Sequence, residues 1–264
     1  KLGEDIRRDS DDRQPQIYEG QIMRLITLGD SWVFGVGADY QEGMSYKNYK
    51  DIAWNQSKNC FRQLISNQFD LENLNLSKGG SSNQAQFRLA LNTFFGKDKI
   101  NVQETDIVLW GITSVFRTEL WHTDKAEFKN IFLPEDTAVS KILSVHHHSE
   151  KEELTILGHQ MQLWNTYFKS MNIKNYWFNV FNDHSWDIKI DNFLFEKTSL
   201  LSLMVNDYTD NDKHHTSRWD ESTDRKITTA KEMKLVNPIS GHPTKKGHEM
   251  IAEQLLKTME GKQK

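Results

Sequence analysis

Two short apolar runs that end in glycine constrain the fold of this chain most strongly. Residues 22–29 (IMRLITLG) and 104–114 (ETDIVLWGITS) are rich in leucine and β-branched residues, and each ends in glycine and small polar residues. Such runs are typical of strands buried on both faces, as in a parallel sheet covered by helices. Further strands are expected at 71–77 and 174–183.

Segments with helical periodicity separate these strands. Apolar residues recur at helical spacing in 53–69, from residue 83 onward, in 151–171 and in 242–259. Leu163 is expected on the buried face of the third of these helices, and Leu91 on the apolar side of the second. The alternation of strands and helices predicts an α/β fold with three layers, α/β/α and flavodoxin-like, around a parallel sheet of about five strands.

A single domain is expected to span residues 23–264. Residues 1–22 are highly charged and lack the apolar segment of a signal peptide, so we expect a leader that is either foreign to the natural chain or poorly ordered. Residues near 115–150 and 185–235 are irregular and are expected to be excursions from this domain. Within the second excursion, 206–224 is expected to be exposed loop.

Charge and cysteine content exclude several classes of protein. The net charge is −4, and both signs are interspersed, which gives no electrostatic footprint for nucleic acid or an acidic membrane. The single cysteine, Cys60, excludes an internal disulfide framework. No apolar run approaches the roughly 20 residues that span a bilayer. We therefore expect no nucleic-acid or membrane partner and a cytoplasmic or otherwise non-secreted location, while the oligomeric state stays open.

The common cofactor and metal motifs are absent. The sequence contains no P-loop, no G-x-S-x-G elbow and no H-E-x-x-H, and its GVGADY segment (35–40) lacks the third glycine of a dinucleotide fingerprint. The histidine runs at 146–148 and 214–215 are interpreted as solvated loop residues rather than metal ligands. No metal and no organic cofactor is expected.

Small polar residues follow each predicted strand, at the edge where parallel sheets bind ligands. Gly-Asp-Ser (29–31) follows the first strand, and the two glycines of NLSKGGSS (75–82) follow the second, where they allow a backbone N–H to approach a substrate oxygen. Thr113 and Ser114 follow the third strand. Far along the chain, His242 precedes the last helix, and Pro243 suits the first turn of that helix. Taken singly, each segment is also typical of an ordinary turn.

Together these segments resemble the SGNH hydrolases, also called the GDSL esterase/lipase family. The first family block, Gly-Asp-Ser, corresponds to 29–31. The second corresponds to Asn75, Ser77, Gly80 and Ser82, and the last to His242, Pro243, Gly247 and His248. The resemblance extends over residues 23–259. It implies the flavodoxin-like fold and a serine hydrolase without a cofactor.

The resemblance also implies roles for individual residues. Ser31 would be the nucleophile, His242 the base, and the N–H groups of Ser31 and Gly80 would hold the oxyanion, with Thr113 as a third donor. The residues expected to line the pocket are Trp32, Asn83, Trp110 and Arg117. The expected substrate is a short-chain acyl ester, such as an acetyl ester, of a small molecule or carbohydrate, because Trp32, Phe34, Trp110 and Phe116 suit a sugar ring or a short chain. A lipase or thioesterase of the same family is the alternative.

Two positions depart from the family pattern. Thr113 stands where the family has the asparagine of its third block, and a threonine hydroxyl has a shorter reach. Ile239 stands where the family has an aspartate, three residues before the histidine. Three alternatives follow for the missing acid: a backbone carbonyl of Pro238, Ile239 or Ser240 accepts the Nδ1 proton in a Ser-His dyad, Asp183 replaces the aspartate, or the chain is a binding or structural module that has lost catalysis.

Overall fold

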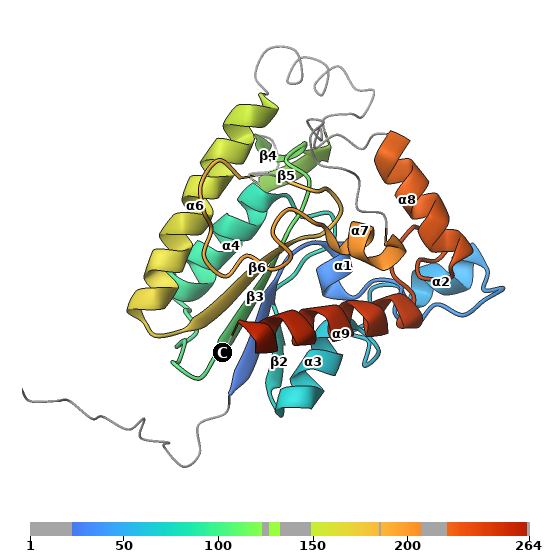
Figure 1. Cartoon of the computed structure of the whole chain (residues 1–264), viewed down its shortest axis with the longest axis horizontal. Coiled ribbons are helices and arrows are strands. Elements are labelled where there is room, and N and C mark those ends of the chain that lie inside the picture. The colour runs from blue at the N-terminus through green and yellow to red at the C-terminus, as the bar shows by residue number, and fades with distance from the viewer. Residues whose placement is uncertain (1–22, 123–126, 133–148, 185, 207–220, 263–264) are drawn as a thin grey trace, which may run out of the picture.

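The computed structural model describes residues 23–122, 127–132, 149–184, 186–206 and 221–262. Parallel strands form its main sheet in the order β2-β1-β3-β6. Their bounds are β1 (Arg24–Leu28), β2 (Glu72–Asn75), β3 (Ile107–Ile112) and β6 (Lys174–Asn179). Helices flank the sheet (Figure 1), so the predicted α/β class is confirmed, with four strands in place of about five.

The backbone beyond β6 explains why a fifth strand is missing from the described sheet. Phe193 and Ser199 form isolated parallel bridges to Trp177 and Asn179 of β6. Between them, Phe195 and Glu196 have φ of 62° and 51°, which is the left-handed region. A strand requires extended φ and ψ. This segment therefore lies along β6 without becoming a strand.

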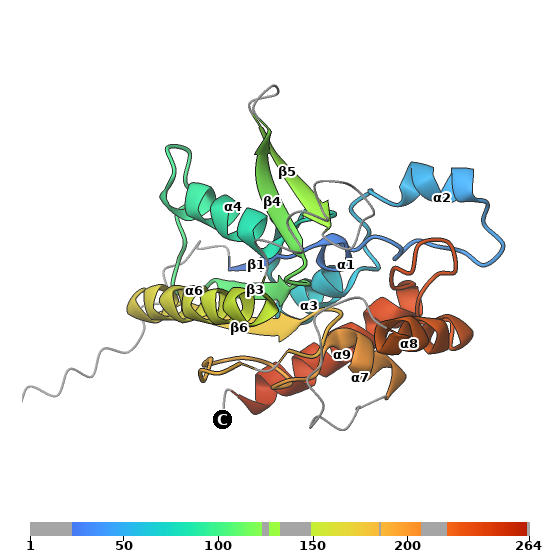
Figure 2. The same cartoon turned by 90° about the horizontal axis from the view of Figure 1, so that it is seen from above.

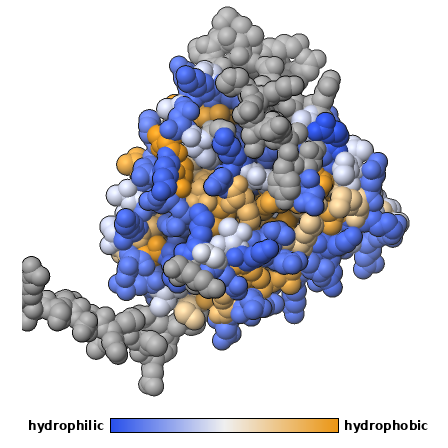
Figure 3. Space-filling view, in the orientation of Figure 1, coloured by the Kyte–Doolittle hydropathy of each residue, from blue (hydrophilic) through white to orange (hydrophobic). Residues whose placement is uncertain are grey.

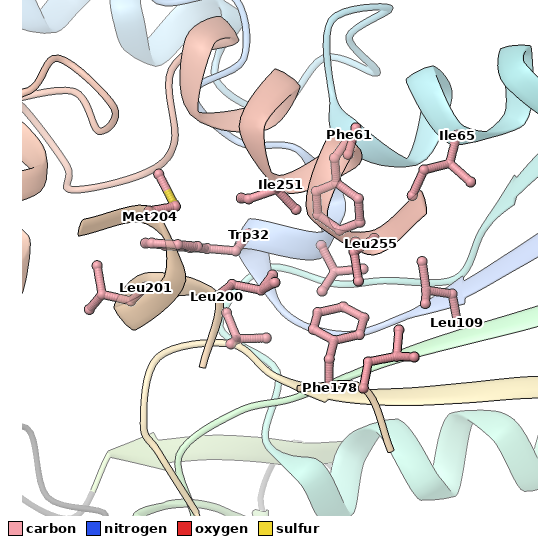
Figure 4. Packing of buried hydrophobic residues seen from close by; sticks show 14 of the residues in the cluster. Trp32, Phe61, Ile65, Leu109, Phe178, Leu200, Leu201, Met204, Ile251 and Leu255 are labelled. Atoms are coloured by element: carbon pink, nitrogen blue, oxygen red, sulfur yellow. The ribbon is translucent and has the colours of Figure 1, made fainter. Parts of the chain in front are cut away.

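Successive side chains along each strand point to opposite faces of the sheet. Leu25 and Leu109 belong to one buried cluster, which Figure 4 shows in part. Ile26 and Val108 belong to the other. The first cluster is covered by α3 (Phe61–Phe69), α7 (Leu200–Val205), α8 (Glu221–Glu232) and α9 (Lys245–Gly261). The second is covered by α4 (Asn83–Phe95) and α6 (Glu150–Ser170).

The two predicted excursions contain regular structure. β4 (Arg117–His122) and β5 (Glu127–Phe132) form an antiparallel hairpin apart from the main sheet (Figure 2). The second excursion contains α7 and α8, so the loop predicted at 206–224 is wrong at its end, where α8 begins at Glu221. Residues 1–22 and the two histidine runs lie outside the described residues.

The outward face of α6 corrects one further expectation. Leu163 is 71% exposed, because Met161, Trp164 and Phe168 already fill the buried face of α6. Leu91 of α4 is 53% exposed and shares the apolar side of its helix with Phe87, as predicted. Both leucines line a shallow apolar groove of about 330 Å³ between the two helices. Elsewhere, hydrophilic residues are mixed with hydrophobic patches on the face that Figure 3 shows. No described helix is both long enough and apolar enough to cross a membrane.

Candidate active site

Ser31 lies directly beyond the carboxyl end of β1. It is the first residue of α1 (Ser31–Phe34), a short helix whose N-cap is Asp30. Val33 of α1 packs against Gly29 and Gly111, where an added Cβ would come within 2.2 Å and 2.5 Å of the valine side chain. These two glycines therefore let α1 approach the ends of β1 and β3 closely, and this fixes the position of Ser31.

Asp30 is fully buried and serves the structure around Ser31. Its Oδ1 accepts from the N–H of Trp32 at 2.9 Å. Its Oδ2 accepts from the Thr113 hydroxyl and from Nη1 of Arg117, both at 3.0 Å. A buried carboxylate needs such partners. Asp30 thus ties α1 to the end of β3 and to the start of β4.

His242 reaches Ser31 from the loop before α9. Its Nε2 lies 2.8 Å from Oγ of Ser31, 211 residues earlier in the chain. The chain approaches closely here because Gly37, with φ of 93°, faces the same loop: an added Cβ would lie 2.6 Å from the carbonyl oxygen of Pro243 and 2.9 Å from Cβ of His242. Thr244 caps α9, which holds the other end of the loop.

The second ring nitrogen of His242 has a side-chain partner. Its Nδ1 lies 2.8 Å from Oγ of Ser240. That oxygen is also 2.6 Å from the hydroxyl of Tyr49, in α2 (Tyr46–Ile52), and 3.1 Å from Oδ1 of Asn237. Sequence reasoning considered only backbone carbonyls from this loop and missed Tyr49 and Asn237. An asparagine and a serine near a histidine are common in loops, and Tyr49 is far away in sequence.

The surroundings of His242 keep its imidazole neutral at pH 7. Burial lowers its pKa to about 4, against a contribution from Asp30 that raises it, while Arg117 lowers it further and a backbone hydrogen bond at Ser240 raises it. A neutral imidazole has a lone pair available on one nitrogen. His242 can therefore accept the proton of Ser31.

The backbone N–H groups of Ser31 and Gly80 have no hydrogen-bond partner among the described residues, so the predicted oxyanion donors are unoccupied by other protein groups. Gly80 is exposed and has φ of 69°, a conformation that glycine adopts without strain.

Thr113 does not provide the third oxyanion donor that the sequence predicts. Its hydroxyl donates to Asp30, and its N–H donates to Oδ1 of Asn83 at 3.0 Å, so both groups are already engaged.

The carboxylate of Asp183 binds groups other than His242. It accepts from the N–H of Ser199, from the Ser202 hydroxyl and from Nζ of Lys226, at 2.6–2.8 Å. Burial alone would raise the pKa of Asp183, but Lys226 and Ser199 hold it below its usual value. Asp183 thus connects the segment after β6 to α7 and α8, and the relocated acid is not supported.

Of the four residues predicted to line the pocket, three are buried and one is partly exposed. Trp32 and Trp110 are 2% and 1% exposed and belong to the two buried clusters, so they pack in the core instead of lining a cleft. Asn83 is buried, and its amide bonds the backbone of Thr113 through both ends. Arg117 remains partly exposed beside Asp30.

An exposed aromatic ring that sequence reasoning missed lies beside the proposed oxyanion donor. Trp54 is 54% exposed, and its six-membered ring occupies the space beside Gly79, where an added Cβ would come within 2.0 Å of it. The ring of Phe34, in the same short helix as Ser31, lies 5.9 Å away. No group of three or more potential metal ligands occurs in the part of the chain that the structure describes.

A serine paired with a histidine at the carboxyl edge of a parallel sheet is an arrangement that serine hydrolases use.

No family model and no curated protein matches the sequence. Solved structures to which the chain is similar include a psychrotrophic esterase from Pseudoalteromonas sp. (11% identity; 91% of this chain and 98% of that chain; TM-score 0.44). Another is a member of the lipolytic G-D-S-L family from Veillonella parvula (12% identity; 90% of this chain and 98% of that chain; TM-score 0.40). A third is an acetylxylan esterase from Geobacillus stearothermophilus, studied as a catalytic mutant (12% identity; 89% of this chain and 93% of that chain; TM-score 0.42).

Proposed function

We propose that this protein is a serine esterase that hydrolyses short-chain acyl esters through an acyl-enzyme. The observation that carries the proposal is the 2.8 Å contact between Oγ of Ser31 and Nε2 of His242 at the carboxyl edge of the sheet. A hydroxyl within hydrogen-bond reach of a neutral imidazole is the geometry of an activated nucleophile.

The reaction proceeds in two halves. In the first, Oγ of Ser31 attacks the ester carbonyl carbon while its proton passes to Nε2 of His242. The resulting tetrahedral oxyanion lies between the N–H groups of Ser31 and Gly80, each worth about 3 kcal/mol in such a site. Its collapse breaks the bond to the leaving alcohol, which takes the proton from Nε2. In the second half, water attacks the acyl-serine with His242 as base, and Ser31 leaves with the returned proton.

The substrate that the site favours is an ester of a carbohydrate or a similar small ring alcohol. Trp54 presents an exposed indole beside Gly79, next to the proposed donor Gly80, and Phe34 adds a second ring. Flat aromatic faces stack on the apolar faces of sugar rings and leave their hydroxyls free for hydrogen bonds. This support replaces the one first expected from Trp32 and Trp110, which are buried.

A fluorophosphonate probe tests the proposal without knowledge of the substrate. We expect wild-type protein to be labelled covalently at Ser31, because the activated hydroxyl attacks phosphorus as it would attack a carbonyl. Ser31→Ala should remove the label, and peptide mass mapping locates it. Ser170→Ala, which removes an exposed hydroxyl at the end of α6, is the matched control and should label like wild type. Absence of labelling in wild type would instead favour a binding module.

The pH dependence of kcat/KM should reflect the lowered pKa of His242. The base form is the neutral imidazole, so activity is lost only as pH falls through about 4, and not through the ordinary value of 6.5. We expect kcat/KM to be flat from about pH 7 to pH 5.5. Initial rates of acetate release, with far-UV circular dichroism at each pH to verify the fold, measure this. A limb centred near 6.5 in folded protein would contradict it.

A further inference from the structure

We infer that Ser240, held by Tyr49 and Asn237, is the positioning residue of His242 and takes the place of the catalytic carboxylate. The inference rests on the proposed function and adds the group that sets the tautomer of its base. It turns on which atoms in this cluster donate and which accept.

The amide of Asn237 has one possible orientation. Its Nδ2 lies 2.9 Å from the carbonyl oxygen of His242, which can only accept. Its Oδ1 lies 2.8 Å from the backbone nitrogen of Ser240, which can only donate. Oδ1 is therefore an acceptor for the Ser240 hydroxyl, 3.1 Å away.

This assignment leaves the Ser240 oxygen with only accepting roles toward its other neighbours. A hydroxyl has one proton, and we assign that of Ser240 to Oδ1 of Asn237, because this is the one neighbour of the hydroxyl that can only accept. The 2.6 Å contact with Tyr49 is then a bond that the tyrosine donates, and the 2.8 Å contact with His242 is one that Nδ1–H donates. With its proton on Nδ1, the neutral imidazole has its lone pair on Nε2, where Ser31 lies 2.8 Å away.

Tyr49 packs in a small apolar cluster that includes Ile239, the residue at the position where the family pattern has an aspartate. Tyr49 is 4% exposed, and burial raises the pKa of its hydroxyl, which therefore keeps its proton at neutral pH. Ile239 packs against the small apolar cluster of Val36, Tyr49 and Ala53. Replacement of an aspartate by Ile239 thus accompanies a different, uncharged support for the same histidine.

Kinetics of a double-mutant cycle test the inference. Ser240→Ala should lower kcat by about tenfold with little change in KM, because substrate contacts remain while the base loses its orientation. Tyr49→Phe should lower kcat by about threefold, and the double variant should equal Ser240→Ala, because Tyr49 acts only through that hydroxyl. Tyr46→Phe, on the same helix but 68% exposed, is the matched control and should equal wild type. Ser240→Thr retains a hydroxyl and should recover most of the activity.

The tautomer itself supplies a readout that does not depend on turnover. With ¹⁵N-labelled histidine, the His242 signals, assigned by their loss in His242→Ala, should show the proton on Nδ1 in wild type. In Ser240→Ala they should shift toward the Nε2–H form. A purely structural role for Ser240 would leave the tautomer unchanged.

The outcomes separate this inference from the proposed function. If wild type is labelled by the fluorophosphonate but Ser240→Ala retains kcat within twofold and the same tautomer, the backbone alone positions His242 and the inference is overturned. Multiplying effects of Ser240→Ala and Tyr49→Phe would also overturn it, since the two would then act independently. If wild type is not labelled at all, the proposed function falls, and the catalytic role of Ser240 falls with it.

Discussion

Ser31→Ala is expected to lower kcat/KM for p-nitrophenyl acetate by about 10⁴-fold or more, since the covalent route disappears with the nucleophile. His242→Ala should lose nearly as much, because without a base the serine hydroxyl stays protonated. The two losses should not multiply in the double variant, since the pair acts as one unit. Initial rates at saturating ester measure kcat, and those at limiting ester measure kcat/KM.

Matched substitutions make this result specific. His159→Gln changes an exposed histidine on α6, far along the chain from either residue, and should keep wild-type rates. Circular dichroism should show that all variants are folded. Activity of Ser31→Ala within tenfold of wild type would show that hydrolysis occurs elsewhere or by another route.

Trp177→Ala is expected to have the largest effect on stability, lowering the free energy of unfolding by about 3–5 kcal/mol. Trp177 is fully buried in β6, and its ring stacks on Trp110 at a centroid distance of 4.7 Å. Its indole N–H also donates to Oδ1 of Asn165 at 2.6 Å. The substitution therefore opens a large cavity and removes a buried hydrogen bond. Urea unfolding monitored by circular dichroism gives the difference.

Leu163→Ala serves as the comparison for that measurement. It removes an apolar side chain of similar chemistry from a position that is 71% exposed, so it should change the free energy of unfolding by less than about 0.5 kcal/mol. A loss of under 1 kcal/mol in Trp177→Ala would mean that the cluster between the sheet, α4 and α6 contributes little to stability.

The fold could be predicted where the apolar pattern leaves one solution. β1 and β3 are short and mostly apolar, and the turn residues that follow them mark the carboxyl edge of the sheet. The pattern could not predict the missing fifth strand, because left-handed residues such as Phe195 are not evident from composition. It also misplaced Leu163, since apolar residues next to the buried stripe of a helix are not distinguished by spacing alone.

The candidate site could be predicted only in part. Ser31, Gly80 and His242 follow from short segments whose order along the chain is informative. The position of Trp110 near a strand end predicts a pocket residue, but side chains alternate between the two faces of a strand, and Trp110 is buried in the core. Tyr49 lies 191 residues from Ser240, and nothing in either segment indicates their contact. Such pairings arise from the fold and not from local sequence.

The fixed amide of Asn237 has a consequence for how far a proton can travel. Its Oδ1 can receive hydrogen bonds but carries no proton to pass on, so the chain of hydroxyls behind His242 ends there. In the assignment inferred above, Tyr49 donates to Ser240, so this contact does not carry a proton away from the hydroxyl. The proton taken from Ser31 therefore stays on the imidazole until the leaving alcohol accepts it. The hydrogen-bonded groups behind His242 orient the imidazole but do not transfer its proton away from the site.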